Sequence, residues 1–156
     1  MDMQELGDRL EIRELIERCS LNVTTRDYDA VGACFHPDAR WRLTAPKLEY
    51  EGRAAIQKGI IKLTGRGEFL VQMAHSIVID DLTAERATAR VVLNEVGRNS
   101  ADQKGFLLLG VYSDVITKVG GRWLFELRTF EPYYLDWSWI SGDVVVDYAK
   151  LAKVSA

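Results

Sequence analysis

The chain has 156 residues, of which 47% are hydrophobic, 28% charged and 10% aromatic. This length suits a single domain over residues 1–156, and the composition is too apolar for an intrinsically disordered chain. The 20 basic and 23 acidic side chains leave a net charge of −3, so no positive field attracts phosphates and we expect no nucleic-acid partner.

Short sequence features disfavour several other classes of protein. No apolar run approaches the roughly 20 residues of a membrane-spanning helix, and the charged start MDMQELGDRLEIREL does not resemble a signal peptide. We therefore expect a cytoplasmic protein without membrane contact, in which Cys19 and Cys34 are reduced, buried thiols. The two histidines, His36 and His75, lack the spacing of metal ligands, so we expect no metal site.

The N-terminal part of the chain shows helical patterns. Between Gln4 and Thr24, apolar residues recur at steps of three and four, which predicts an amphipathic helix. This apolar stripe consists of Leu6, Leu10, Ile12, Leu15, Ile16 and Cys19. A second, short helix is predicted to begin at Tyr28 with Asp27 as its N-cap and to end at His36-Pro37-Asp38.

Strand patterns dominate the rest of the chain. Alternation predicts a first strand at residues 40–45, with Trp41 and Leu43 on its buried side, before a third helix at residues 53–63. Four long strands are then predicted, at residues 69–80, 87–96, 105–118 and 122–130. The Gly120-Gly121 turn joins the last two as a hairpin. Helices followed by an antiparallel meander indicate an α+β fold, in which helices cover one face of a curved sheet.

An aromatic tail follows at residues 132–156. Its segment PYYLDWSWI, at residues 132–140, is too apolar to be fully exposed on a monomer. We expect this tail to close a cavity as a lid or to cover a subunit interface. A final helix is expected at residues 144–154.

Several motifs occur in an order similar to that of a known family. They are DRLEIRELI in the first helix, RDYDAV and FHPDARW after it, an isolated His75, and GVYSDVI followed by GGRW. Over residues 5–131 this order resembles the SnoaL-like branch of the nuclear transport factor two-like superfamily. The resemblance implies a cone, in which a bent sheet wraps around the N-terminal helices and encloses an apolar cavity. Because that fold hosts dehydratases, dehydrochlorinases, cyclases, isomerases and non-catalytic modules, the cavity residues must decide the function.

The dehydratase and dehydrochlorinase relatives remove a proton from their substrate with a His–Asp dyad. By resemblance, His75 occupies the position of the histidine, whereas Thr24 occupies that of the aspartate. Thr24 can orient an imidazole but cannot stabilise its charged form. Asp27 would replace the aspartate if the helix end were shifted, although helix capping is its alternative role. The same comparison puts Leu43 where steroid isomerases carry their carboxylate base, which excludes that mechanism.

His75 is predicted to lie in phase with Ile77 and Ile79, and therefore to face the apolar interior. There it acts either as a general base near neutral pH or as a core histidine that bonds a backbone carbonyl or Thr24.

Further cavity residues are expected on the strands. Glu95 is in phase with Val91 and Leu93, so its carboxyl is predicted to enter the cavity with a pKa raised by burial, unless this face of the sheet points outward. Tyr112 either donates a hydrogen bond to the substrate or packs in the core. Arg128 either holds a carboxylate or pairs with a glutamate of the sheet. The predicted substrate-binding set is Trp41, Leu43, Glu95, Tyr112 and Arg128.

These residues favour an acid-base enzyme of lyase, cyclase or isomerase type that acts on a small apolar molecule, such as an aromatic or polyketide-like one. The sequence contains no phosphate loop, dinucleotide fingerprint or flavin motif, so we expect no cofactor. Two alternatives remain open: a non-catalytic ligand-binding or assembly module, and the small subunit of a ring-hydroxylating oxygenase. We also expect a homodimer or a larger symmetric homo-oligomer, because the outer face of a bent sheet needs cover.

Overall fold

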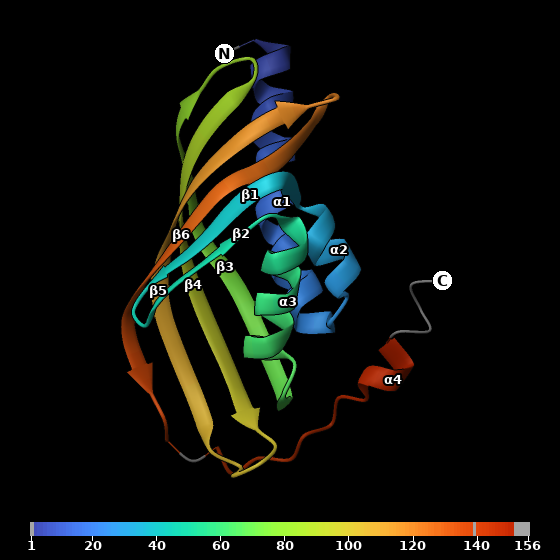
Figure 1. The fold of residues 1–156 in the computed structure, drawn as a ribbon, viewed down its shortest axis with the longest axis vertical. Coiled ribbons are helices and arrows are strands. Elements are labelled where there is room, and N and C mark those ends of the chain that lie inside the picture. The colour runs from blue at the N-terminus through green and yellow to red at the C-terminus, as the bar shows by residue number, and fades with distance from the viewer. Residues whose placement is uncertain (1, 139, 152–156) are drawn as a thin grey trace.

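The N-terminal helices pack against one face of a curved, six-stranded sheet (Figure 1). The structure is a computed structural model that describes residues 2–138 and 140–151. Its elements in chain order are α1 (Met3–Thr25), α2 (Tyr28–Ala33), β1 (Phe35–Thr44), β2 (Lys47–Glu51), α3 (Arg53–Thr64), β3 (Gly67–Leu82), β4 (Arg86–Asn99), β5 (Gly105–Val119), β6 (Arg122–Asp136) and α4 (Tyr148–Leu151). This arrangement confirms the predicted α+β class.

The strands lie in the order β2-β1-β6-β5-β4-β3. Strands β3 to β6 form the predicted antiparallel meander, and β1 pairs in parallel with β6. Gly120 and Gly121 have positive φ angles of 57° and 79° at the predicted hairpin turn. Strand β1 begins at Phe35, earlier than predicted, because Phe35 pairs with Phe125 of β6. The segment His36-Pro37-Asp38 therefore belongs to a strand.

Helix α1 agrees with the predicted helix, and Asp2 caps it by accepting a hydrogen bond from the Glu5 amide at 2.8 Å. Its buried apolar side chains are Ile12, Ile16, Cys19 and Val23. The predicted stripe is wrong at its start, where Leu6 and Leu10 are 41% and 59% exposed. The buried side chain at this end of the helix is instead that of Asp8, which is 4% exposed.

Asp8 fastens α1 to the β5–β6 hairpin. Its Oδ1 accepts hydrogen bonds from Lys118 Nζ at 2.6 Å and from Trp123 Nε1 at 2.9 Å.

We expect Asp8→Ala to lower the free energy of unfolding by about 1–3 kcal/mol, because two donors lose a buried acceptor. Urea denaturation measures this loss. Glu14→Ala is the control, because it removes only an exposed pair with Arg18, and equal losses in the two variants would contradict the prediction.

A β-bulge in β3 decides which of its side chains face the helices. Ser76 has a φ angle of 46°, and the register with β4 shifts between His75 and Val78. Gln72 lines the interior before the bulge and Ile77 is buried after it, although their positions differ by an odd number of residues. His75 is exposed. The prediction that His75 faces inward is wrong, because the extra residue of the bulge reverses the alternation.

The C-terminal tail leaves β6 and passes the ends of β4 and β5 toward the helical side of the sheet (Figure 1). Arg98 Nη1 donates hydrogen bonds to the carbonyl oxygens of Ile140 and Gly142, both at 2.8 Å. The guanidinium of Arg26 lies 3.7 Å from the ring centre of Tyr148. These contacts attach the tail to the body of the fold.

The predicted C-terminal helix is shorter than expected. Residues 144–147 are not helical, and α4 covers Tyr148–Leu151. Residues 152–154 of the predicted helix and Trp139 of the aromatic segment lie outside the described residues. In the part of the chain that the structure describes, no helix is both long and apolar enough to cross a membrane.

Candidate active site

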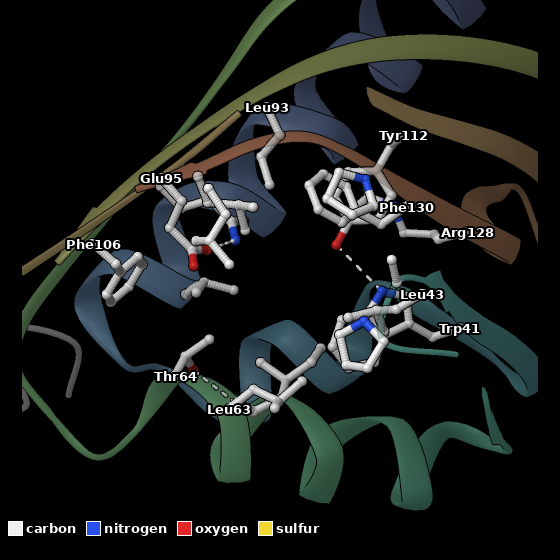
Figure 2. Close-up of a pocket in the computed structure, with 18 of the residues that line it drawn as sticks. Trp41, Leu43, Leu63, Thr64, Leu93, Glu95, Phe106, Tyr112, Arg128 and Phe130 are labelled. Carbon is white, nitrogen blue, oxygen red and sulfur yellow. Dashed lines mark hydrogen bonds between the residues drawn. The ribbon is translucent and has the colours of Figure 1, made fainter. Parts of the chain in front are cut away.

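A cavity of about 610 Å³ lies between the inner face of the sheet and the helices (Figure 2). Its wall is largely apolar and includes Val23, Phe35, Leu93, Phe106, Leu108 and Phe130. The side chains that bring polar atoms to this wall are Cys19, Trp41, Thr64, Gln72, Glu95, Tyr112 and Arg128, with tail tyrosines at one end. A mainly apolar cavity of this size with a few polar groups is typical of a small-molecule site.

The predicted substrate-binding set lies together in this wall: Trp41, Leu43, Glu95, Tyr112 and Arg128. Glu95 comes from β4 and Tyr112 from β5, and Figure 2 shows them on different sides of the cavity. Trp41 of β1 lies on the side of Tyr112 (Figure 2). The inward orientation of these side chains agrees with the alternation of their strands, and their role in binding stays a prediction.

Glu95 is a nearly buried carboxyl group that faces the cavity. It is 8% exposed, and its Oε2 accepts a hydrogen bond from Gln72 Nε2 at 2.7 Å. Among the described residues, its Oε1 has no hydrogen-bond donor. Burial raises the pKa of Glu95, and the hydrogen bond from Gln72 opposes this shift only in part. The carboxyl group can therefore exchange a proton with a bound molecule nearer to neutral pH than an exposed glutamate can.

Tyr112 presents a hydroxyl group to the same cavity. Trp41 Nε1 donates a hydrogen bond to Tyr112 Oη at 3.2 Å, so the oxygen acts as an acceptor toward the protein. Its own proton has no acceptor among the described residues and is available for a ligand. Burial raises the pKa of Tyr112, whereas the charge of Arg128 opposes this shift. The phenol therefore stays protonated and can donate to a carbonyl oxygen.

Arg128 forms a buried ion pair that supports the wall behind Tyr112. Its Nε and Nη2 donate to the two carboxylate oxygens of Asp114 at 2.9 and 3.1 Å. Burial lowers the pKa of Arg128, but the Asp114 carboxylate, together with the nearby Cys19 and Tyr112, outweighs that effect, so the pKa is raised. The guanidinium also lies 4.0 Å from the ring centres of Tyr112 and Phe125. The predicted pairing with a glutamate is wrong, because the bidentate partner is Asp114.

The structure does not bring the three predicted catalytic residues together. His75 is exposed and does not line the cavity. Thr24 is hydrogen-bonded to the backbone of β3, because its Oγ1 accepts a hydrogen bond from the Gln72 amide at 2.9 Å. Asp27 caps α2 by accepting from the Ala30 amide at 3.0 Å. The predicted dyad of His75 with Thr24 or Asp27 is therefore wrong. No group of residues suited to a metal ion occurs in the described ranges.

Sequence reasoning missed Gln72, the hydrogen-bond partner of Glu95. The two residues are direct cross-strand partners in the β3–β4 ladder. A register count from the loop that joins β3 and β4 would have found the pair only if both register shifts in β3, between Ile79 and Asp81 and between His75 and Val78, had been known. Thr24 then acquires a different role from the predicted one, because it holds the backbone of Gln72.

Comparisons with known proteins agree with this fold. The model of the SnoaL-like domain matches residues 4–129. The chain is similar to a scytalone dehydratase-like protein from Novosphingobium aromaticivorans, with 21% identity, a TM-score of 0.81, and coverage of 92% of this chain and 100% of that chain. It is also similar to a LinA-type3 hexachlorocyclohexane dehydrochlorinase from Novosphingobium barchaimii, with 16% identity, a TM-score of 0.80, and coverage of 94% and 99%.

A third similar structure is a protein of unknown function with a cystatin-like fold from Nostoc punctiforme, with 22% identity, a TM-score of 0.68, and coverage of 81% and 91%. At these identities the likenesses establish the fold and leave the chemistry to the side chains of the site. No curated protein matches the chain.

Proposed function

The chain belongs to the SnoaL-like domain family, and we propose that it is a cofactor-independent enzyme that moves a proton on a small, largely apolar molecule by elimination, cyclisation or isomerisation. The observation that carries the proposal is Glu95, which is 8% exposed in an apolar cavity and has one carboxylate oxygen that accepts no hydrogen bond from the residues that the structure describes. Burying an ionisable group without a full set of partners costs free energy. A ligand with a transferable proton is the partner that this carboxyl group lacks.

Glu95 and Tyr112 suit the two halves of such a reaction. In its ionised form, Glu95 takes a proton from a carbon atom next to a carbonyl group, while Gln72 holds its other oxygen. Tyr112 donates its hydroxyl hydrogen to the carbonyl oxygen and stabilises the negative charge that forms there. The Trp41 hydrogen bond and the charge of Arg128 both favour negative charge at Tyr112, which strengthens it as a donor.

The next step decides the reaction type. If Glu95 returns the proton to a different carbon, the substrate is isomerised. If the electrons instead expel a leaving group, the reaction is an elimination, and Glu95 can give its proton to that group. The apolar wall and the aromatic rings of Trp41, Phe106 and Phe130 favour a flat, neutral substrate, such as an aromatic or polyketide-like ketone.

The proposal is tested with a panel of phenolic, polyketide-like and steroid-like ketones. Thermal shift identifies the compounds that bind, and turnover is then measured for each of them.

We expect Tyr112→Phe to lower kcat by about 10²–10³-fold, because one donor to the developing oxyanion is lost. Tyr50→Phe is the matched control, because the Tyr50 ring stacks on the Trp41 ring, with 5.4 Å between the ring centres, and Tyr50 does not line the cavity. Equal kcat values in the two variants would argue against this role of Tyr112.

A non-catalytic ligand-binding module is the second candidate. It is favoured by Thr24, which stands at the aspartate position that the resemblance implies and is occupied with the backbone of Gln72. Tight binding without turnover of any compound in the panel, together with equal affinity in wild type and Glu95→Gln, would support this alternative. The small subunit of a ring-hydroxylating oxygenase stays a prediction, as does the cytoplasmic location.

A symmetric homo-oligomer also stays a prediction. The outer face of the sheet exposes Val71, Val78 and Val92, which are 37%, 48% and 39% exposed. An apolar sheet face of this kind would be covered by a second copy of the chain.

A further inference from the structure

A row of four side chains crosses the outer face of the sheet, on the side opposite to the helices. His75 of β3 pairs with Val92 of β4. Val92 pairs with Val111 of β5, and Val111 pairs with Glu131 of β6. On β4, β5 and β6 a direct chain neighbour of each row member lines the cavity, and Ala74 beside His75 packs against the core. Because side chains alternate along a strand, the whole row points outward.

The row has a hydrogen-bond donor at one end, a carboxylate at the other and apolar side chains between them. His75 and Glu131 are exposed, Val92 is 39% exposed and Val111 is half-buried. An imidazole can donate a hydrogen bond whether it is neutral or charged, whereas an ionised carboxylate only accepts. Three strand spacings, about 14 Å, separate the two ends within one chain. His75 and Glu131 of the same chain therefore do not meet.

We propose that this face binds a second copy of the chain around a two-fold axis that runs between β4 and β5, parallel to the strands. Rotation about this axis reverses the order of the row. His75 then lies opposite the partner's Glu131, and Val92 lies opposite the partner's Val111. Each dimer gains two imidazole–carboxylate hydrogen bonds around an apolar centre. A two-fold axis along the row would instead place Glu131 opposite the partner's Glu131, which like-charge repulsion disfavours.

The neighbouring rows are compatible with the same axis, because each member of a β4–β5 pair lies opposite the partner's copy of the other member. Val96 pairs with Leu107, so Val96 lies opposite the partner's Leu107 in an apolar contact. Asn94 pairs with Leu109 and gives a mixed contact in the same way. Neither row brings like charges together. The interface lies on the face opposite to the cavity, so the inference does not rest on the chemistry proposed for Glu95.

Sedimentation equilibrium of the full chain measures the dissociation constant of the dimer. We expect the wild type to be a dimer at micromolar concentration. Val92→Glu should weaken it by at least about 10²-fold, because a carboxylate then enters the apolar centre of the interface. Leu10→Glu is the matched control, because Leu10 is 59% exposed on α1, and it should leave the constant unchanged. A wild-type monomer or trimer, or equal effects of the two substitutions, overturns the proposal.

Two single variants test the pairing at the ends of the row, and circular dichroism confirms that each is folded. In its own dimer, His75→Glu places a carboxylate opposite the partner's Glu131, and Glu131→Lys places an ammonium group opposite the partner's His75. Each should weaken its own dimer by at least about 10-fold. An equal mixture of the two should dimerise again, because the heterodimer pairs the new carboxylate with the new ammonium group and keeps one original contact. A mixture that dissociates like the separate variants overturns the proposal.

Discussion

Glu95→Gln is expected to lower the turnover of any substrate found for this protein by about 10²–10⁴-fold, the range typical of a lost acid-base group. The amide has nearly the shape of the carboxyl group and can keep a hydrogen bond to Gln72. In the wild type, Gln72 Nε2 lies 2.7 Å from Glu95 Oε2. It cannot accept a proton from carbon. Binding should therefore survive the substitution while kcat falls, and steady-state kinetics separate the two effects.

Glu126→Gln is the matched control, because Glu126 lies on β6 in an exposed pair with Arg86. It should leave kcat unchanged. A Glu95→Gln variant with wild-type kcat would remove Glu95 as the base, whatever its affinity for the substrate.

The pH dependence of the wild type gives an independent check on Glu95. As a base it works only when ionised, and its pKa is raised by burial. The value of kcat/KM should therefore increase with pH through a point above the ordinary range of glutamate, and this step should be absent from the residual activity of Glu95→Gln.

The raised pKa also determines how Glu95 affects stability. Between the unfolded pKa and the higher folded pKa, the native state binds more protons than the unfolded state, so stability decreases as the pH increases through this interval. Above it, the buried charge of Glu95 opposes folding. Glu95→Gln should therefore be at least as stable as wild type at neutral pH, as measured in urea. A loss of activity without a loss of stability would assign this carboxyl group to function.

Asp114→Ala is expected to have the largest effect on stability, about 3–5 kcal/mol in the free energy of unfolding. Arg128 is 3% exposed and has Asp114 as its bidentate partner, so the substitution leaves a buried guanidinium charge without its carboxylate. Urea denaturation at neutral pH measures the loss. The double variant Asp114→Leu/Arg128→Met removes both charges and should recover much of it, because the unpaired charge is then absent.

Asp80→Ala is the matched control for this prediction. Asp80 pairs with Arg90 at 2.6 Å in a similar two-oxygen geometry, but on the exposed side of the sheet. Water solvates both partners there, so the loss should be far smaller than in Asp114→Ala. Similar losses in the two variants would show that burial of the Arg128 pair does not matter.

The sequence by itself determined α1, α3, the four long strands and the side chains on their regular parts, but it did not predict β2 (Lys47–Glu51). Apolar spacing was sufficient for α1 and α3, and the two glycines at 120 and 121 marked the β5–β6 turn. Glu95 and Tyr112 could be placed on the inner face because strand alternation holds from Ala87 to Glu95 and at Tyr112. These features depend on neighbours a few residues away, which the sequence lists in order.

Only the tertiary structure decided which polar groups meet. The bulge at Ser76 turned His75 outward and Ile77 inward, and a bulge depends on how two strands fit together more than on the residue that forms it. The partners Asp114 and Arg128 belong to different strands and meet through the β5–β6 register. Because burial and pairing together set the energy of a charge, and both arise from packing between distant segments, the chemistry of this site follows from the assembled fold.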